Sequence, residues 1–243
     1  MACGEKLIYR SIPEPLTCYF CQETKLGSIS CVNNHFVCDD CHGKDAFSAI
    51  LDIALGTESN DPVEIAEQMM SHPSVTMIGG EHHAIVATSV MAALKNNGSI
   101  AYNNRQITVN DYLIERTLDR TWTDRLPSCM CANYGACGAA LGAGAVFSLL
   151  MDATCDTPKV RERQLAMEVT NYVASEIARF RGTCCKLSTR IAIEGACIAM
   201  RDYLRLDLPR RDVRCQHKKR NPYKCLGSIC PYSKETSNQS KPL

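Results

Sequence analysis

The sequence lacks long apolar runs, an excess of charge and a terminal sorting segment. The longest apolar stretch, residues 143–151, is far shorter than the roughly 20 residues that a membrane-spanning helix needs. Residues 1–15 contain no apolar core of a secretory signal. The net charge of +1 provides no broad field for holding a nucleic acid backbone. These absences favour a cytoplasmic protein that does not associate with a membrane. Nucleic acid is not the expected partner.

Nucleotide-binding motifs are missing as well. The glycines of GAALGAGAV, residues 138–146, lack the GxGxxG order after a strand, and no Walker lysine is present. Disorder is also excluded, because 45% of the 243 residues are hydrophobic and only 22% are charged, so the chain can bury a sizeable core. The sequence therefore indicates a globular protein without a nucleotide site.

Cysteine, in contrast, is abundant, with sixteen residues in the chain. In a reducing cytosol, cysteines at short spacings are better explained as metal ligands or catalytic thiols than as disulfides. Thirteen of them fall into four clusters, at residues 18–41, 129–137, 184–185 and 215–230, while Cys3, Cys155 and Cys197 stand alone.

Helical signals dominate the chain between these clusters. Asp61, Pro62 and Glu64 are typical of a helix start, and Pro73 ends that helix. The glycine-rich segment 138–151 is expected to form a buried central helix, because its small residues let another backbone approach closely. Further helices are expected over residues 81–98, 111–120 and 157–180, and from a cap at Ser188 or Thr189 to residue 206. No alternating strand pattern is found after the first forty residues.

These signals predict a mainly α fold, in which a helical bundle-like domain is preceded by a small zinc-ribbon-like β element and followed by a cysteine-rich tail. The expected divisions are residues 1–45, 46–208 and 209–243. After about residue 233, the composition KETSNQSKPL predicts disorder.

The strongest chemical signal is a pair of CxxC motifs at Cys18, Cys21, Cys38 and Cys41, joined by a short hairpin. Four thiolates at this spacing can surround a zinc ion tetrahedrally, with bonds of about 2.3 Å. Such a site is closed, so it predicts a structural role. Cys31 and His35 belong to the same loop and could replace one of the four ligands.

Two further cysteine groups precede helices. Cys131 and Cys137 lead into the glycine-rich helix, and the adjacent Cys184 and Cys185 follow Gly182. The N-terminus of a helix favours a thiolate, which makes these cysteines candidates for reactive or metal-bound sulfurs that meet in one buried pocket. The alternative is that each is a small thiol packed separately in the core.

Glu81, His82 and His83 follow two glycines at the start of another helix. They could supply metal ligands or a general base to the same pocket. Adjacent residues do not share a helix face, so only one histidine should point inward. The alternative is one core histidine and one solvated histidine.

The tail carries Cys215, Cys225 and Cys230, with His217 nearby and Pro231 after the last cysteine. These residues could close a zinc site or hold a 4Fe–4S cluster whose remaining iron is open or completed from elsewhere. The basic residues of segment 210–220 form either a solvated face or a contact for phosphate or RNA.

Taken together, the motifs CDDCH, EIAE, EHHAIV, CANYGACGAALGAG, CCK and CLGSICPY make the chain, from about Cys18 to Tyr232, similar to a family of uncharacterised cysteine-rich domains of anaerobic bacteria and archaea. The resemblance implies that the family's shared residues fall on Cys18, Cys21, Cys38, Cys41, Glu81, His82, His83, Cys131, Cys137, Cys184, Cys185, Cys215, Cys225 and Cys230. The family pattern has glycine where this chain has Cys129. Fusions to methyltransferase domains in relatives hint at methyl or sulfur metabolism.

Two functions compete at this point. One is a metal- or iron–sulfur-dependent redox or sulfur-transfer enzyme, in which the Cys and His residues act on a small-molecule or protein-bound substrate. The other is a zinc-stabilised adaptor or regulatory module without catalytic activity, in which the cysteines are structural. The residue pattern determines neither the substrate nor the oligomeric state.

Overall fold

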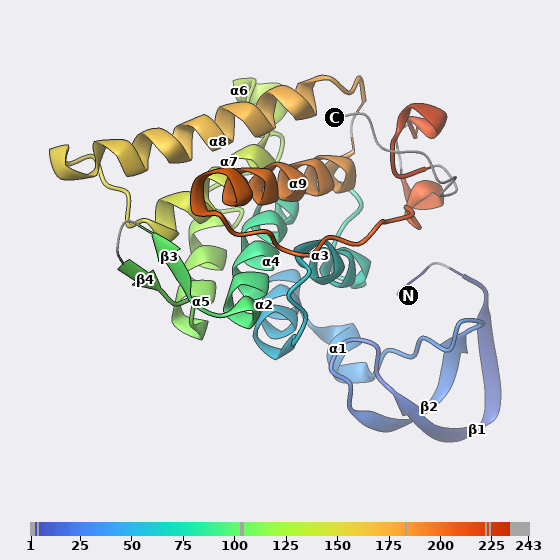
Figure 1. Cartoon of the computed structure of the whole chain (residues 1–243). Helices are drawn as coiled ribbons and strands as arrows, with labels where there is room; N and C mark the ends of the chain where they lie inside the picture. Colours follow the sequence, from blue (N-terminus) through green and yellow to red (C-terminus); the bar gives the residue numbers. More distant parts are fainter. Residues whose placement is uncertain are drawn as a thin grey trace.

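The computed structural model describes residue 3 and residues 5–102, 105–182, 184–221, 223 and 225–233. Within these ranges the chain forms a mainly helical body, with a small β ribbon at its N-terminal end and a cysteine-rich tail beside the helices, as the sequence predicts (Figure 1). The expected disorder after residue 233 lies outside the described residues.

The ribbon consists of two antiparallel strands, β1 (Leu7–Thr17) and β2 (Thr24–Cys31), with a bulge between Tyr9 and Glu14. A short helix, α1 (Asp39–Gly43), follows it. Figure 1 shows the strands projecting away from the helices, whereas the cysteine end of the ribbon adjoins the body. Phe20 and Phe36 belong to the same apolar core as the body helices, so the base of the ribbon is packed against the body.

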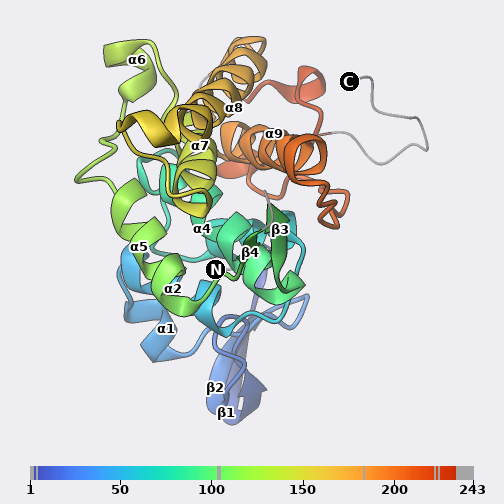
Figure 2. The ribbon, with the colours of Figure 1, turned by 60° about the vertical axis from the view of Figure 1, so that its left-hand side comes forward.

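The body is built around α4 (Glu81–Asn97), which is surrounded by other helices in Figure 2. Its neighbours are α2 (Ala46–Gly56), α3 (Pro62–Ser71), α5 (Asp111–Thr121), α7 (Gly138–Leu150) and α9 (Cys185–Leu204). Residues 81–94 of α4 are all buried, which fits a helix covered on every side. The remaining helices are α6 (Met130–Tyr134), α8 (Val160–Ala178) and the short 3-10 turns η1 (Thr157–Lys159), η2 (Lys218–Arg220) and η3 (Gly227–Ile229).

The predicted helix signals are confirmed where they are local. Asp61 caps α3 by accepting hydrogen bonds from the N–H groups of Val63 and Glu64, at 2.9 and 3.1 Å. The helix α4 ends at Gly98, whose φ of 99° suits glycine. None of the helices in the described residues combines the length and the apolar character that a membrane span requires.

Two expectations were wrong. A second hairpin, β3 (Ile100–Tyr102) with β4 (Arg105–Ile107), follows α4 although no strand was expected there; strands of three residues are too short to show an alternating pattern. The last long helix, α9, begins at Cys185 rather than after Ser188 or Thr189. Its cap is Cys184, whose carbonyl accepts from the Ser188 N–H at 3.1 Å, so the helix extends one turn further.

The small residues of α7 do permit close approach, as expected. A Cβ added to Gly142 would lie 2.4 Å from the carbonyl oxygen of His83 on α4. A Cβ at Gly138 would lie equally close to the His83 ring. The two glycines therefore fix how near α7 comes to α4, and they hold the start of α7 against His83.

We expect Gly142→Ala to destabilise the protein by about 1–3 kcal/mol, because the backbone of α4 has to move to relieve the overlap. Gly56→Ala is the control, since a Cβ there would meet nothing within 4 Å. Its effect should stay within about 1 kcal/mol. Urea unfolding followed by circular dichroism measures both changes. Equal stabilities of the two variants would contradict the close packing.

Candidate metal and thiol sites

The two CxxC motifs of the ribbon come together around one point. The four ligand sulfurs of Cys18, Cys21, Cys38 and Cys41 all lie within 4.8 Å of one another. The sulfurs of Cys21 and Cys38 are 3.8 Å apart, which is the edge of a tetrahedron with zinc–sulfur bonds of about 2.3 Å. Cys21 is exposed and the other three are buried. The spacing and geometry fit a single tetrahedral metal ion.

Local structure positions these sulfurs. Cys18 and Cys21 lie in the turn between β1 and β2, while Cys38 caps α1 and Cys41 lies within it. Burial opposes ionisation of the Cys18 thiol, but backbone N–H groups, foremost that of Cys38 at 3.5 Å, lower its pKa to about 7. Burial and the neighbouring thiols raise the pKa of Cys41. A cation bound among these thiols would favour their ionised forms.

A second group forms at the end of β2 and in the loop after it, and it includes Cys3, which the sequence did not indicate. The ligand atoms of Cys3, Cys31 and His35 are within 4.8 Å of one another, and the two sulfurs are 3.5 Å apart. His35 Nδ1 is buried and has no hydrogen-bond partner. Cys31 and His35 thus do not replace a member of the four-cysteine group. Cys3 lies 28 residues before Cys31, so no short spacing pointed to it.

The thiols expected in one pocket divide between two places. Cys137 caps α7, and Cys184 and Cys185 begin α9, so the expected helix N-termini are present. Cys185 lies near the Gly79 N–H, which lowers its pKa, and near enough to Cys137 and Cys131 for their charges to raise it. Cys184 instead lines a cavity with the tail cysteines. We name Cys131, Cys137 and Cys185 the body thiols.

At the start of α9, burial has a larger effect on the pKa of the thiols than the helix N-terminus has. It raises the pKa of Cys185 to about 11, to which the nearby sulfurs of Cys137, Cys184 and Cys131 add. It also raises the pKa of Cys184. The expected stabilisation of thiolates is therefore wrong for these two residues. The free energy needed to remove a sulfur anion from water is larger than the stabilisation that the helix N–H groups provide. Cys131 is exposed and Cys137 half-buried, so solvent reaches the body thiols from their side.

Of the three residues that begin α4, His83 is the one beside the body thiols. Its ring lies against Gly138, next to Cys137, and its Nδ1 is 3.0 Å from the Leu126 carbonyl oxygen. His82 is fully buried and turns the other way, with Nε2 3.5 Å from Lys186 Nζ. The carboxylate of Glu81 accepts from the Thr76 N–H at 2.8 Å and so closes the loop before α4. Both histidines are buried, so the alternative of one core histidine and one solvated histidine is wrong.

The tail folds back on the body, and its described part reaches Ser233. The N–H of Cys215 donates to the Tyr232 carbonyl oxygen at 2.7 Å, and Cys230 and Tyr232 pack on Leu187 and Ile191 of α9. Cys215, Cys225 and Cys230 line one small cavity. The three tail cysteines therefore lie together, held against the start of α9.

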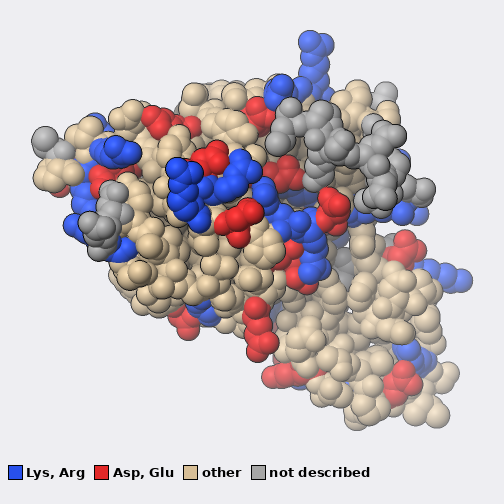
Figure 3. All heavy atoms as spheres, viewed as in Figure 1, with Lys and Arg blue, Asp and Glu red and all other residues tan. Residues whose placement is uncertain are grey.

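Two arginines at the start of the basic segment are paired with acids. Arg211 contacts Asp61 at 3.3 Å and also Glu64, and Arg210 contacts Asp207 at 3.6 Å. Figure 3 shows Lys and Arg side chains in a band across this face, with Asp and Glu interspersed. This mixture fits a solvated charged face and gives little support to an RNA contact.

The backbone at Cys129 would suit the glycine that the resemblance implies there. Its φ of 62° lies in the left-handed region, which glycine adopts without strain. Cys129 is exposed at the start of a five-residue helix and belongs to neither cysteine group.

Fold and sites define a cysteine-rich, mainly helical protein with cysteine groups that could bind metal ions. All sixteen cysteines are free thiols. The chain belongs to a family of unknown function, DUF5714, whose model matches residues 50–233. The match covers the helical body and the tail together and begins after the ribbon cysteines, so it starts later than the resemblance from Cys18 suggested. No curated protein and no solved structure is significantly similar to the chain.

Proposed function

We propose that the protein is a cytoplasmic sulfur-transfer or thiol redox enzyme whose reacting groups are the body thiols, with structural zinc in the ribbon. The observation that carries the proposal is that Cys185, at the start of α9, lies near enough to Cys131 and Cys137 for their charges to affect its pKa, with the His83 ring beside them against Gly138. A thiol that only fills space in the core needs no partner thiols, whereas transfer of sulfur benefits from a second thiol within reach.

The chemistry follows from thiol exchange. The thiolate of Cys137 attacks the outer sulfur of a persulfide donor; the donor's S–S bond breaks, a new S–S bond forms on Cys137, and the donor leaves as a thiolate. The thiol of Cys185 then attacks the Cys137 sulfur, which gives a protein disulfide and releases hydrogen sulfide. The two protein thiols are oxidised to a disulfide by the loss of two electrons, and these two electrons reduce the transferred sulfur to hydrogen sulfide.

His83 supports proton transfer in this scheme. Its Nδ1 faces a carbonyl oxygen, which only accepts, so Nδ1 carries the proton and Nε2 is free to accept one. Burial lowers the pKa of His83, and the Leu126 contact only partly offsets this effect, so the imidazole is neutral at pH 7. A neutral imidazole can take the proton of a thiol.

The substrate is a small or protein-bound sulfur compound, because the body thiols are open to solvent on the side of Cys131. A nucleic acid partner is not proposed, since the arginines before the tail are paired with carboxylates. A reducing compartment fits the sixteen free thiols.

The adaptor remains the second candidate because of one feature of the ribbon. Tyr9, Ile12 and Leu26 are 73%, 79% and 73% exposed on its two strands. Large apolar side chains gathered on a small ribbon are typical of a surface that another protein covers. In that case the body thiols would be structural.

The two functions differ in reactivity toward a persulfide. We expect the full-length protein, kept anaerobic, to take up one sulfur atom from cysteine persulfide on Cys137, as located by tandem mass spectrometry. Cys185→Ser should accumulate the persulfide and release less sulfide, because the resolving thiol is gone. Cys155 is exposed and belongs to no cysteine group, so it serves as the internal control. Labelling of the body thiols no faster than Cys155 would favour the adaptor.

A further inference from the structure

Cys184 and the three tail cysteines face one cavity, although the sequence separates them. The cavity is lined by the sulfur-bearing residues Cys184, Cys215, Cys225 and Cys230, together with Arg190 and Lys218. Cys184 comes from the start of α9, Cys215 from the segment after the body, and the other two from the turn around η3. Four thiols from three chain segments around a single cavity are a pattern expected of a ligand set.

The adjacent pair is divided by helix geometry. Cys184 caps α9 in an extended conformation, whereas Cys185 is the first helical residue. Their side chains consequently leave the helix start in different directions. Cys184 reaches the tail cavity, and Cys185 reaches Gly79 and the body thiols. The pair therefore serves two sites, which accounts for two neighbouring cysteines at this point of the chain.

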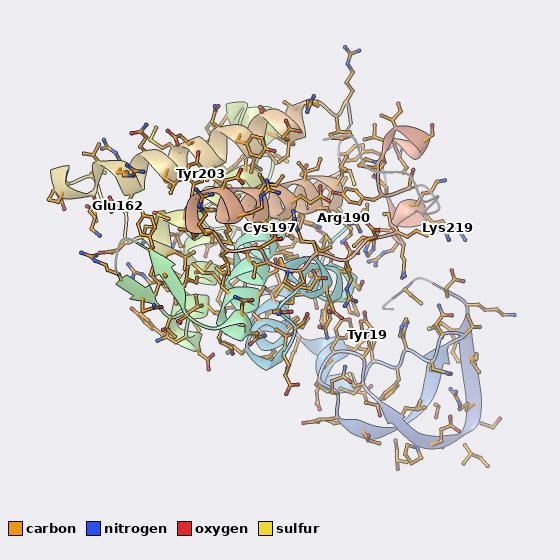
Figure 4. All side chains as sticks on the ribbon, viewed as in Figure 1. Tyr19, Glu162, Arg190, Cys197, Tyr203 and Lys219 are labelled. Carbon is orange, nitrogen blue, oxygen red and sulfur yellow. The ribbon has the colours of Figure 1, made fainter. Side chains whose placement is uncertain are left out.

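The surroundings suit a negatively charged centre. Arg190 is 1% exposed and lies at the end of α9 nearest the tail, where Figure 4 also labels Lys219. The Arg190 guanidinium and Cys215 line the same cavity, near enough for their charges to interact. A cluster or ion held by four thiolates keeps a net negative charge, which buried guanidinium and hydrogen bonds to sulfur stabilise.

The spacing of the cavity sulfurs differs from that of a single tetrahedral zinc site. A zinc ion holds its four sulfurs about 3.8 Å apart, given bonds of about 2.3 Å. The ribbon group has this compactness, but no three of the cavity sulfurs lie within 4.8 Å of one another. A cubane places its ligands on different irons and so holds them farther apart. Pro231, directly after Cys230, also follows the pattern of iron–sulfur ligand runs.

We propose that Cys184, Cys215, Cys225 and Cys230 together bind one 4Fe–4S cluster, with Cys184 as the ligand supplied by the body. The cluster joins α9 to the tail at the place where Cys215 bonds to the Tyr232 backbone. This inference does not rest on the persulfide chemistry, because Cys184 takes no part in it.

The test is anaerobic expression of the full chain with iron and sulfide supplied, followed by analysis of iron and acid-labile sulfide. The wild-type protein is expected to contain both in equal amounts and to show a broad visible absorption that dithionite bleaches. Cys184→Ser should lose most of the iron, the sulfide and the absorption. Cys185→Ser, the matched control one residue along the same helix start, should keep them.

A second variant separates loss of the cluster from misfolding. Cys225→Ser alters the tail and leaves α9 untouched, so it should lose the cluster while the helical circular dichroism stays that of the wild type. The proposal is overturned if Cys184→Ser keeps the iron and sulfide of Cys185→Ser. It is also overturned if the wild-type protein reconstituted with iron and sulfide contains no sulfide and binds zinc at the tail instead.

Discussion

Replacing Cys38 with serine is expected to release the metal of the ribbon and unfold residues 5–41, while the helical body stays folded. A two-stranded hairpin is marginal in water without additional support, and the sulfurs of Cys18, Cys38 and Cys41 occupy the buried base of this ribbon. Structural zinc contributes on the order of 10 kcal/mol to the folding of small domains. Losing one of four thiolates therefore removes most of what holds the ribbon.

The measurement combines zinc analysis with limited proteolysis. Cys38→Ser should lose its ribbon zinc and be cut rapidly before α2, and a strong chelator should do the same to the wild-type protein. Cys155→Ser provides the control, because Cys155 is exposed and outside the cysteine groups. A Cys38→Ser protein with full zinc content and the melting curve of the wild type would reject the site.

Signals that lie within a few residues made the ribbon site and several helices predictable. The CxxC spacing fixes two sulfurs on one turn, and Asp61, Pro62 and Glu64 fix the start of α3, since each depends only on neighbouring backbone. Cys3 could not be found in this way. Its approach to Cys31 depends on the path of the whole strand β1, which no local pattern encodes.

The division of Cys184 from Cys185 was also missed, for a different reason. The rule that adjacent residues on a helix point in different directions was applied to His82 and His83 but holds equally for this pair. The start of α9 was misplaced because Ser188 and Thr189 are good caps in isolation. Leu187 packs in one apolar cluster with the tail residue Tyr232. This tertiary contact favours a helix that begins before Ser188 and Thr189.

The pairing of Glu67 with Arg190 is the other interaction with a large expected effect. Arg190 Nε and Nη2 donate to the two carboxylate oxygens of Glu67 at 2.5 and 2.8 Å, and they join α9 to α3. The guanidinium also lies over the Tyr232 ring, 5.2 Å from its centroid. His217 is 3.9 Å from Glu67 but forms no ion pair at pH 7, because burial lowers its pKa to about 3. Glu67 therefore supplies the main negative charge for a buried guanidinium.

Glu67→Gln is expected to destabilise the protein by about 3–5 kcal/mol, since it leaves the Arg190 charge buried without its carboxylate. Adding Arg190→Met should recover part of that loss, because the double variant buries no charge. Glu176→Gln is the matched control: its partner, Arg179, makes a similar two-oxygen contact but is 67% exposed, so the change should stay within about 1 kcal/mol. Urea unfolding of the anaerobically purified proteins gives the free energies. If the double variant is as unstable as the sum of its single changes, the two side chains are not coupled.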